Sequence, residues 1–199
     1  CIVPILLTIV IVLLALFVTT IYFPKLEKYV QIICMIPYTI QGVILSVSIL
    51  SLYVGNKSVL SNRMVMLMGA YCIVILPYIY QGIRNGMRAV NMVTLIEAAE
   101  MLGASKIYAF FRVVVPNIIS AIIVSSLLAV GIIFGDYVLI RNLAGTSAPN
   151  MQIFLYQTMK SDSTKASAVF VIIMFVTFVI TAVVLFLKSR EGKNRVQKK

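Results

Sequence analysis

Residues 97–116 read EAAEMLGASKIYAFFRVVVP and hold Glu97 and Glu100, two of only six acidic residues in the chain. Around the start of this stretch, residues 91–103 repeat apolar side chains at spacings of three and four, which predicts a short amphipathic helix. Its apolar stripe would consist of Met92, Leu95, Ile96, Ala99 and Leu102. Gly103 is the predicted C-terminal stop, because glycine tolerates the left-handed conformation that ends many helices.

The start of this helix has two possible caps. Thr94 and Glu97 have the spacing of a capping box, and Asn91 is an earlier alternative. Helices that lie on lipid usually carry Lys and Arg on the polar face. This helix has two Glu and no Lys or Arg between Asn91 and Gly103, which favours a protein partner over a lipid surface.

The sequence on either side of this segment is strongly apolar. Apolar residues make up 61% of the chain, charged residues 12%, and the mean hydropathy is +1.05. Five uncharged runs are each long enough to cross a bilayer as a helix, which takes about 20 residues. They are residues 1–24, 29–56, 64–83, 113–135 and 166–187. The chain is therefore predicted to be an all-α, polytopic membrane helical bundle, with a kink or late helix start at Pro37.

Basic residues are unevenly divided between the loops. Twelve Lys and Arg lie in the first and third loops and the C-terminal tail, and five lie in the second and fourth loops. The positive-inside bias then predicts that loop 84–112 and the C-terminus are cytoplasmic. Residues 1–187 would form one transmembrane domain, followed by a short, disordered basic tail at 188–199. Because the basic residues are scattered over both faces, nucleic acid is not an expected partner.

The start of the chain suggests a longer protein. Five spans and a cytoplasmic C-terminus would leave the N-terminus outside, yet the chain begins with Cys1 inside an apolar run. We expect a preceding segment with at least one more helix. A lipidated N-terminal cysteine is the alternative.

The sequence lacks the motifs of an enzyme or a metal site. Three cysteines without CxxC spacing and the absence of histidine make metal binding and disulfides poor interpretations. No Gly-x4-Gly-Lys-Ser/Thr motif occurs, so this chain is not expected to bind or hydrolyse ATP. We expect no enzymatic activity and no cofactor in this chain.

One motif carries a family resemblance. Glu97-Ala98-Ala99 is followed after three residues by Gly103, and after nine more by Val113-Val114-Val115-Pro116. This pattern resembles the signature of permease subunits of binding-protein-dependent ABC importers, in the spermidine/putrescine, ferric iron and phosphonate group. The flanking stretches LPYIYQGIRNGMRAVN and FGDYVLIRNLAG also look familial, and the resemblance covers roughly residues 20–187. The family usually has Ile-x-Leu-Pro where this chain has Val-x-Val-Pro.

The resemblance implies a type I importer permease core in the bacterial cytoplasmic membrane. Residues 91–103 would then be the coupling helix, seated in a cleft of a separate ATPase subunit that binds ATP. The ATPase-coupling residues carried over are Glu97, Ala98, Ala99, Gly103 and Pro116. Further partners implied are a second permease subunit, identical or sister, the lipid bilayer, and an extracytoplasmic solute-binding protein docking near residues 141–165.

A few polar residues are candidates for contact with the transported solute. Asp136 could face extracellular water at a helix end near Arg141, or contact a cationic solute, in which case a polyamine is slightly favoured. Other polar residues in the apolar runs could line a path, although serines in membrane helices also serve close packing. These candidates are Gln41, Tyr78 and Gln81, with Ser46, Ser48, Ser125 and Ser126.

Two other functional classes compete with the importer. A stand-alone channel or secondary carrier would need intramembrane charges or repeat symmetry, and the sequence has one such acid and no repeat. A structural membrane subunit without a transport role is the second alternative. Only the importer requires a nucleotide-hydrolysing partner bound through residues 91–103.

Overall fold

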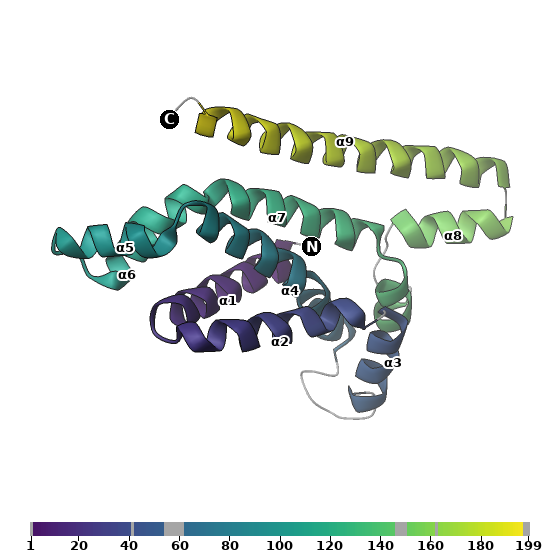
Figure 1. Cartoon of the computed structure of the whole chain (residues 1–199). Coiled ribbons are helices and arrows are strands. Elements are labelled where there is room, and N and C mark those ends of the chain that lie inside the picture. Colours follow the sequence, from purple (N-terminus) through teal and green to yellow (C-terminus); the bar gives the residue numbers. More distant parts are fainter. Residues whose placement is uncertain (1, 41, 54–61, 146–150, 162, 197–199) are drawn as a thin grey trace.

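The structure is a computed structural model that describes residues 2–40, 42–53, 62–145, 151–161 and 163–196. Within these ranges all regular structure is helical, in agreement with the predicted fold class. The elements, shown in Figure 1, are α1 (Ile2–Ile21), η1 (Pro24–Leu26), α2 (Glu27–Thr39), α3 (Gly42–Tyr53), α4 (Arg63–Ala89), α5 (Met92–Met101), α6 (Lys106–Ala109), η3 (Phe110–Val114), α7 (Val115–Gly135), η4 (Ile140–Ala144), α8 (Met151–Ser161) and α9 (Ser163–Val196).

Four described helical segments are long and apolar enough to cross a membrane: Ile2–Ile21, Arg63–Ala89, Lys106–Gly135 and Thr164–Val183. The fifth predicted span is different, because α2 and α3 meet at an angle of 96° and could cross only as one bent pair. Among the described residues there are therefore four candidate spans, or five if the bent pair is counted as one span.

The predicted kink at Pro37 is misplaced. Helix α2 begins at Glu27, well before Pro37, and continues to Thr39. The amide of Ile40 still donates to the carbonyl of Pro37 at 3.2 Å, so the helix ends one turn after the proline. A proline removes the bond that its own amide would make to the preceding turn, and leaves its carbonyl available to the next one.

The core of the chain is the pair α4 and α7, which lie side by side with α1 on the other flank of α4. Glycines make the contact close. A Cβ atom built on Gly82 would lie 2.5 Å from the Cβ of Ser125, and one on Gly86 would lie 2.5 Å from the Cβ of Ala121. Small residues allow membrane helices to approach this closely, and dispersion contacts then hold them together.

Ser125 belongs to this packing contact. Its hydroxyl is buried and donates to the carbonyls of Ala121 and Ile122 on its own helix. Ser126 likewise donates to Ile122 at 2.6 Å. Of the two interpretations of these serines, close helix packing is the one that their contacts favour.

Helix α9 runs alongside α7 at the edge of the molecule, with α8 next to it (Figure 1). The expected disordered tail is wrong for residues 188–196, because α9 continues without a break to Val196. An amphipathic helix, α8, also occupies part of the predicted outer loop. Neither proline nor glycine occurs between Ser163 and Glu191 to end α9 where its apolar part ends.

Candidate functional site

Helix α5 follows α4 after a turn at Val90 and Asn91. Asn91 has φ 50° and ψ 60°, a left-handed conformation that asparagine tolerates better than most residues. Its amide donates to the carbonyl of Arg88 at 3.1 Å, and its carbonyl accepts from the amide of Leu95 at 3.2 Å. Its side chain makes no capping hydrogen bond. The predicted capping box is therefore wrong, because Thr94 lies inside a helix that has already begun at Met92.

The end of α5 agrees with the sequence prediction. Gly103 has φ +83°, and its amide donates to the carbonyl of Glu100 at 2.9 Å. The amide of Ala104 donates to the carbonyl of Ala99 at 3.0 Å. These two bonds form a Schellman motif, in which glycine is favoured because the conformation crowds any Cβ atom.

The apolar stripe of α5 faces the chain's own core, which corrects its predicted use as a free docking face. Met92 is 3% exposed and Ile96 is 4% exposed. At the other end of the stripe, Leu102 is 90% exposed, as is the neighbouring Met101 at 89%. The helix is thus anchored by its first turns, and its last turn projects from the molecule.

The exposed part of α5 carries the carboxylates. Glu97 and Ala98 are exposed, Ala99 is half-buried, and Gly103 is exposed at the helix end. Glu100 forms a loose ion pair with Lys106 at 3.7 Å. Among the described residues, Glu97 has no hydrogen-bond or ion-pair partner. The structure therefore brings Glu97, Ala98 and Gly103 together on one accessible surface, which we call the α5 tip (residues 97–103).

Pro116 lies apart from this surface, as the second residue of α7. A π-helical turn, η3, precedes it, and the amide of Val115 donates five residues back to the carbonyl of Phe110. The side chain of Asn117 donates to the carbonyl of Val113, one turn back on the same helix, at 2.7 Å. Helix therefore extends from Lys106 to Gly135, beginning earlier than the predicted start at residue 113.

Asp136 lies just beyond the other end of α7 and is half-buried. The hydroxyl of Tyr71 on α4 donates to its Oδ2 at 3.1 Å, and the backbone amides of Val138, Leu139 and Ile140 also bond to it. Burial raises the pKa of Asp136 above its ordinary value, although these hydrogen bonds act in the opposite direction. Asp136 thus begins the turn that follows α7 and ties it to α4.

The predicted neighbour Arg141 is exposed, and its guanidinium lies over aromatic rings, 5.8 Å from the ring centre of Tyr137 and 5.1 Å from that of Tyr156. Lys160 lies 4.8 Å from the same Tyr156 ring. This cluster forms a basic, aromatic surface at the Asp136 end of α7.

The remaining path candidates lie elsewhere. Tyr78 is 36% exposed and its ring centre lies 5.7 Å from that of Tyr38 on α2. The side-chain amide nitrogen of Gln81 donates to the sulfur of Met35, also on α2, at 3.4 Å. Tyr78 and Gln81 therefore share the α2 side of α4, about 10–15 Å along the helix from Tyr71. Gln41 lies outside the described residues.

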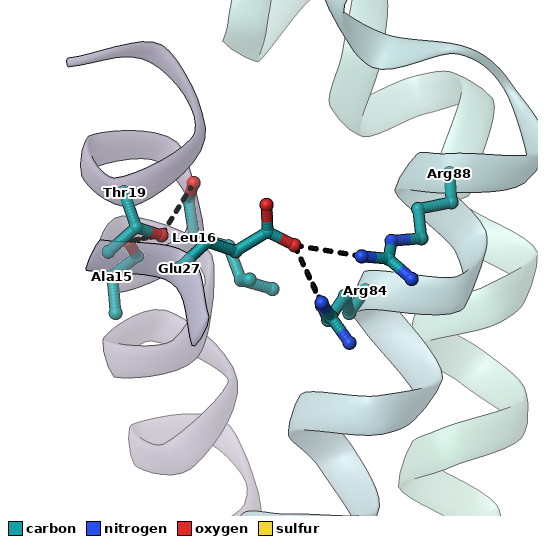
Figure 2. A network of polar contacts seen from close by, with 6 residues as sticks. All are labelled: Ala15, Leu16, Thr19, Glu27, Arg84 and Arg88. Atoms are coloured by element: carbon teal, nitrogen blue, oxygen red, sulfur yellow. Dashed lines mark hydrogen bonds and ion pairs between the residues drawn. The ribbon is translucent and has the colours of Figure 1, made fainter. Parts of the chain in front are cut away.

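Two contacts were missed by sequence reasoning. Ser46, which is fully buried, accepts a 2.7 Å hydrogen bond from Asn142. Figure 2 shows the second: Glu27 Oε1 accepts hydrogen bonds from Nε of Arg84 at 2.9 Å and from Nη2 of Arg88 at 3.2 Å. Nη2 of Arg84 lies 2.8 Å from the same oxygen and completes an ion pair. The available signal was Arg84 and Arg88 one turn apart, with an acid at the start of another apolar run. Over the part of the chain that the structure describes, no cluster of His, Cys, Asp and Glu could hold a metal ion.

A comparison with protein families identifies the family to which most of the chain is similar. The family model described as "Binding-protein-dependent transport system inner membrane component" matches residues 11–191. The matched segment begins within α1, ends within α9, and includes the α5 tip. No curated protein matches the chain.

Proposed function

The chain belongs to the family of binding-protein-dependent transport system inner membrane components, and on that premise we propose that the α5 tip is the surface through which an ATPase subunit drives this permease. The family is that of type I ABC importer permeases, in which ATP hydrolysis belongs to a partner subunit. The alternatives of a stand-alone carrier and a purely structural subunit have no comparable support.

The observation that carries the proposal is the exposure of Met101 and Leu102 beside Glu97. Both apolar side chains are about nine-tenths exposed at the end of a helix whose first turns are buried through Met92 and Ile96. An apolar helix end flanked by carboxylates suits a groove on a protein, since a lipid surface would be met by basic residues.

The anchoring of α5 supports the transmission of movement. Its first turn is buried through Met92, and only Val90 and Asn91 separate it from α4. At its other end Gly103 leads within three residues to the continuous helix Lys106–Gly135. A displacement of the α5 tip would therefore move α4 and α7, whose glycine contacts favour motion as a rigid pair.

Glu97→Arg tests the docking surface directly. Reversing this charge should lower transport more than tenfold and weaken co-purification of the ATPase, while the permease still inserts. Lys25→Glu is the matched control, because Lys25 is exposed on η1, outside the α5 tip, and the charge change has the same size.

Gly103→Pro tests the helix end. Proline requires φ of about −65°, whereas Gly103 has φ +83°, so the Schellman turn cannot form. ATP hydrolysis should continue without proportionate transport. If both Glu97→Arg and Gly103→Pro retain the ATPase and transport normally, the coupling proposal fails.

For the solute we propose a small charged molecule, with a polyamine slightly favoured because of Asp136. The hydrogen bonds that Asp136 makes to its own chain supply a second, structural role, so the test must separate the two. Asp136→Asn removes the negative charge. Tyr71→Phe removes one hydrogen bond to Asp136 but leaves its charge in place. A loss of labelled spermidine uptake in Asp136→Asn alone would support the solute contact, and equal losses in both would contradict it.

We also propose that the α5 end and the C-terminus are cytoplasmic, on the basis of the bias in Lys and Arg. The opposite end, with Arg141 and Lys160, would then meet acidic groups of the solute-binding protein. A C-terminal tag should be cleaved by protease in inside-out vesicles and protected in right-side-out vesicles. The reverse result would contradict this orientation.

A further inference from the structure

A cavity of about 330 Å³ opens between the ends of α1 and α4 and the start of α5. Leu16 and Met87 supply apolar wall, and Glu27, Arg84 and Arg88 supply charge. Residues 91–94, which begin α5, close one side. The cavity therefore has an apolar part and a charged part, and it adjoins the helix that carries the α5 tip.

The charges around this cavity do not cancel. A single oxygen of Glu27 accepts the hydrogen bonds from both Arg84 and Arg88 (Figure 2). Two guanidinium groups thus face one carboxylate, and each guanidinium has five N–H donors. The side chain of Arg84 is 13% exposed and that of Arg88 is 61% exposed, so Arg88 has donors available to a further acceptor.

The position of the cavity matches a membrane boundary. Leu16 lies near the end of α1, which finishes at Ile21, and Arg84 and Arg88 lie in the last turns of α4, which finishes at Ala89. Both helices are candidate spans, so their ends lie where lipid headgroups begin. Lys25 and Lys28 are exposed nearby in the sequence and add positive charge to this end.

We propose that this cavity binds the phosphodiester headgroup of an anionic phospholipid, with Arg88 and Arg84 as donors to the phosphate and Leu16 and Met87 against the first carbons of the lipid. Basic pockets between membrane helices are suited to such headgroups, since a phosphate accepts several hydrogen bonds from paired arginines. Glu27 holds the two arginines in place and limits the affinity, because its charge repels the phosphate.

The site has a consequence for coupling, which rests on the proposed function. Residues 92–94 line the cavity and belong to the first turn of α5, in which Met92 is buried. A bound headgroup would therefore stiffen the connection between α4 and α5, and transport per ATP hydrolysed should increase with the anionic lipid content of the membrane. The binding itself does not depend on the ATPase.

The test is binding of phosphatidylglycerol to the purified full-length permease, measured by native mass spectrometry in detergent. Phosphatidylcholine and inorganic phosphate serve as the neutral-lipid and free-phosphate probes. Arg88→Gln should weaken phosphatidylglycerol binding about fivefold, as expected for one basic residue near a lipid headgroup. Glu27→Gln should strengthen it. The matched control is Arg112→Gln, because Arg112 is exposed and does not line the cavity.

The sign of the Glu27→Gln effect separates a ligand site from a purely structural ion pair, which would lose stability on this change and gain no affinity. The proposal is overturned if Arg88→Gln and Arg112→Gln weaken binding equally, or if phosphatidylcholine binds as well as phosphatidylglycerol. Equal binding of inorganic phosphate would overturn the lipid as the occupant. None of these outcomes depends on transport, so they leave the ATPase proposal to be judged separately.

Discussion

Helices α4 and α9 are both apolar enough to cross a membrane, but they relate to the rest of the chain in opposite ways. In the most apolar 18-residue stretch of each helix, 44% is buried inside the molecule for α4, but only 11% for α9. Helix α4 presents Gly82 and Gly86 to α7, whereas α9 has no glycine before Gly192 and exposes large side chains such as Phe175 and Phe178. Among apolar helices in lipid, association follows the fit of small residues, since apolarity alone does not drive it.

The largest effect should come from filling the α4–α7 contact. Gly86→Leu would place a side chain where even a Cβ lies 2.5 Å from Ala121, so the helices must separate. We expect a loss of about 3 kcal/mol, at the upper end of overpacking costs, measured as the free energy of unfolding in detergent and denaturant. Gly131→Leu is the control, because nothing lies within 4 Å of a Cβ built there. Equal stability of the two variants would refute the close contact.

Removing volume from the same contact should have a smaller effect. Ile118 on α7 is 1% exposed, and Ile118→Ala leaves a cavity next to Gly86. The expected loss is about 2 kcal/mol, because the unfolded helix in lipid also buries its isoleucine and the cost is mainly lost packing. The same unfolding measurement applies, and a loss below 0.5 kcal/mol (about the noise for surface sites) would count against a packed α4–α7 core.

The hydrogen bond between Tyr71 and Asp136 joins α4 to the end of α7. Tyr71→Phe should cost about 1 kcal/mol, since Asp136 retains its bonds to backbone amides. Thermal unfolding of the purified permease is a suitable measurement. A loss as large as that of Gly86→Leu would mean that this contact, and not the glycine packing, holds the pair.

The smallest effect should come from α9. Phe178 is 70% exposed, so Phe178→Ala should change stability by less than about 0.5 kcal/mol in the isolated chain. Comparing the isolated permease with the assembled transporter sharpens the contrast. A loss that appears only in the assembly would identify this face of α9 as a subunit contact, and a large loss in the isolated chain would contradict its exposure.

The sequence predicted the features that depend on local chemistry. The all-α class follows from the length of the apolar runs, and the end of α5 at Gly103 follows from the conformational freedom of glycine. Periodicity correctly grouped Met92 and Ile96 on one face of a helix. It could not show whether that face meets a partner or the chain's own core, because the covering residues come from distant segments.

The wrong and missed predictions arise where tertiary structure, and not local sequence, decides the outcome. Thr94 has the right spacing for a cap, but the helix starts earlier, at Met92, directly after the turn at Asn91. Glu27 lies 57 residues from Arg84, and Ser46 lies 96 residues from Asn142, so neither contact has a local signal. For the candidate site, the accessible position of Glu97, Ala98 and Gly103 was predictable, whereas the projecting Met101 and Leu102 required the structure.

The central claim, that the α5 tip meets the ATPase, is most directly tested by photo-crosslinking in the assembled transporter. A photoreactive amino acid at position 102, where the native side chain is 90% exposed, should form a covalent adduct with the ATPase subunit. The same amino acid at position 178 of α9 serves as the exposed control and should not. Adducts from position 102 to lipid alone, with none to the ATPase, would contradict the account.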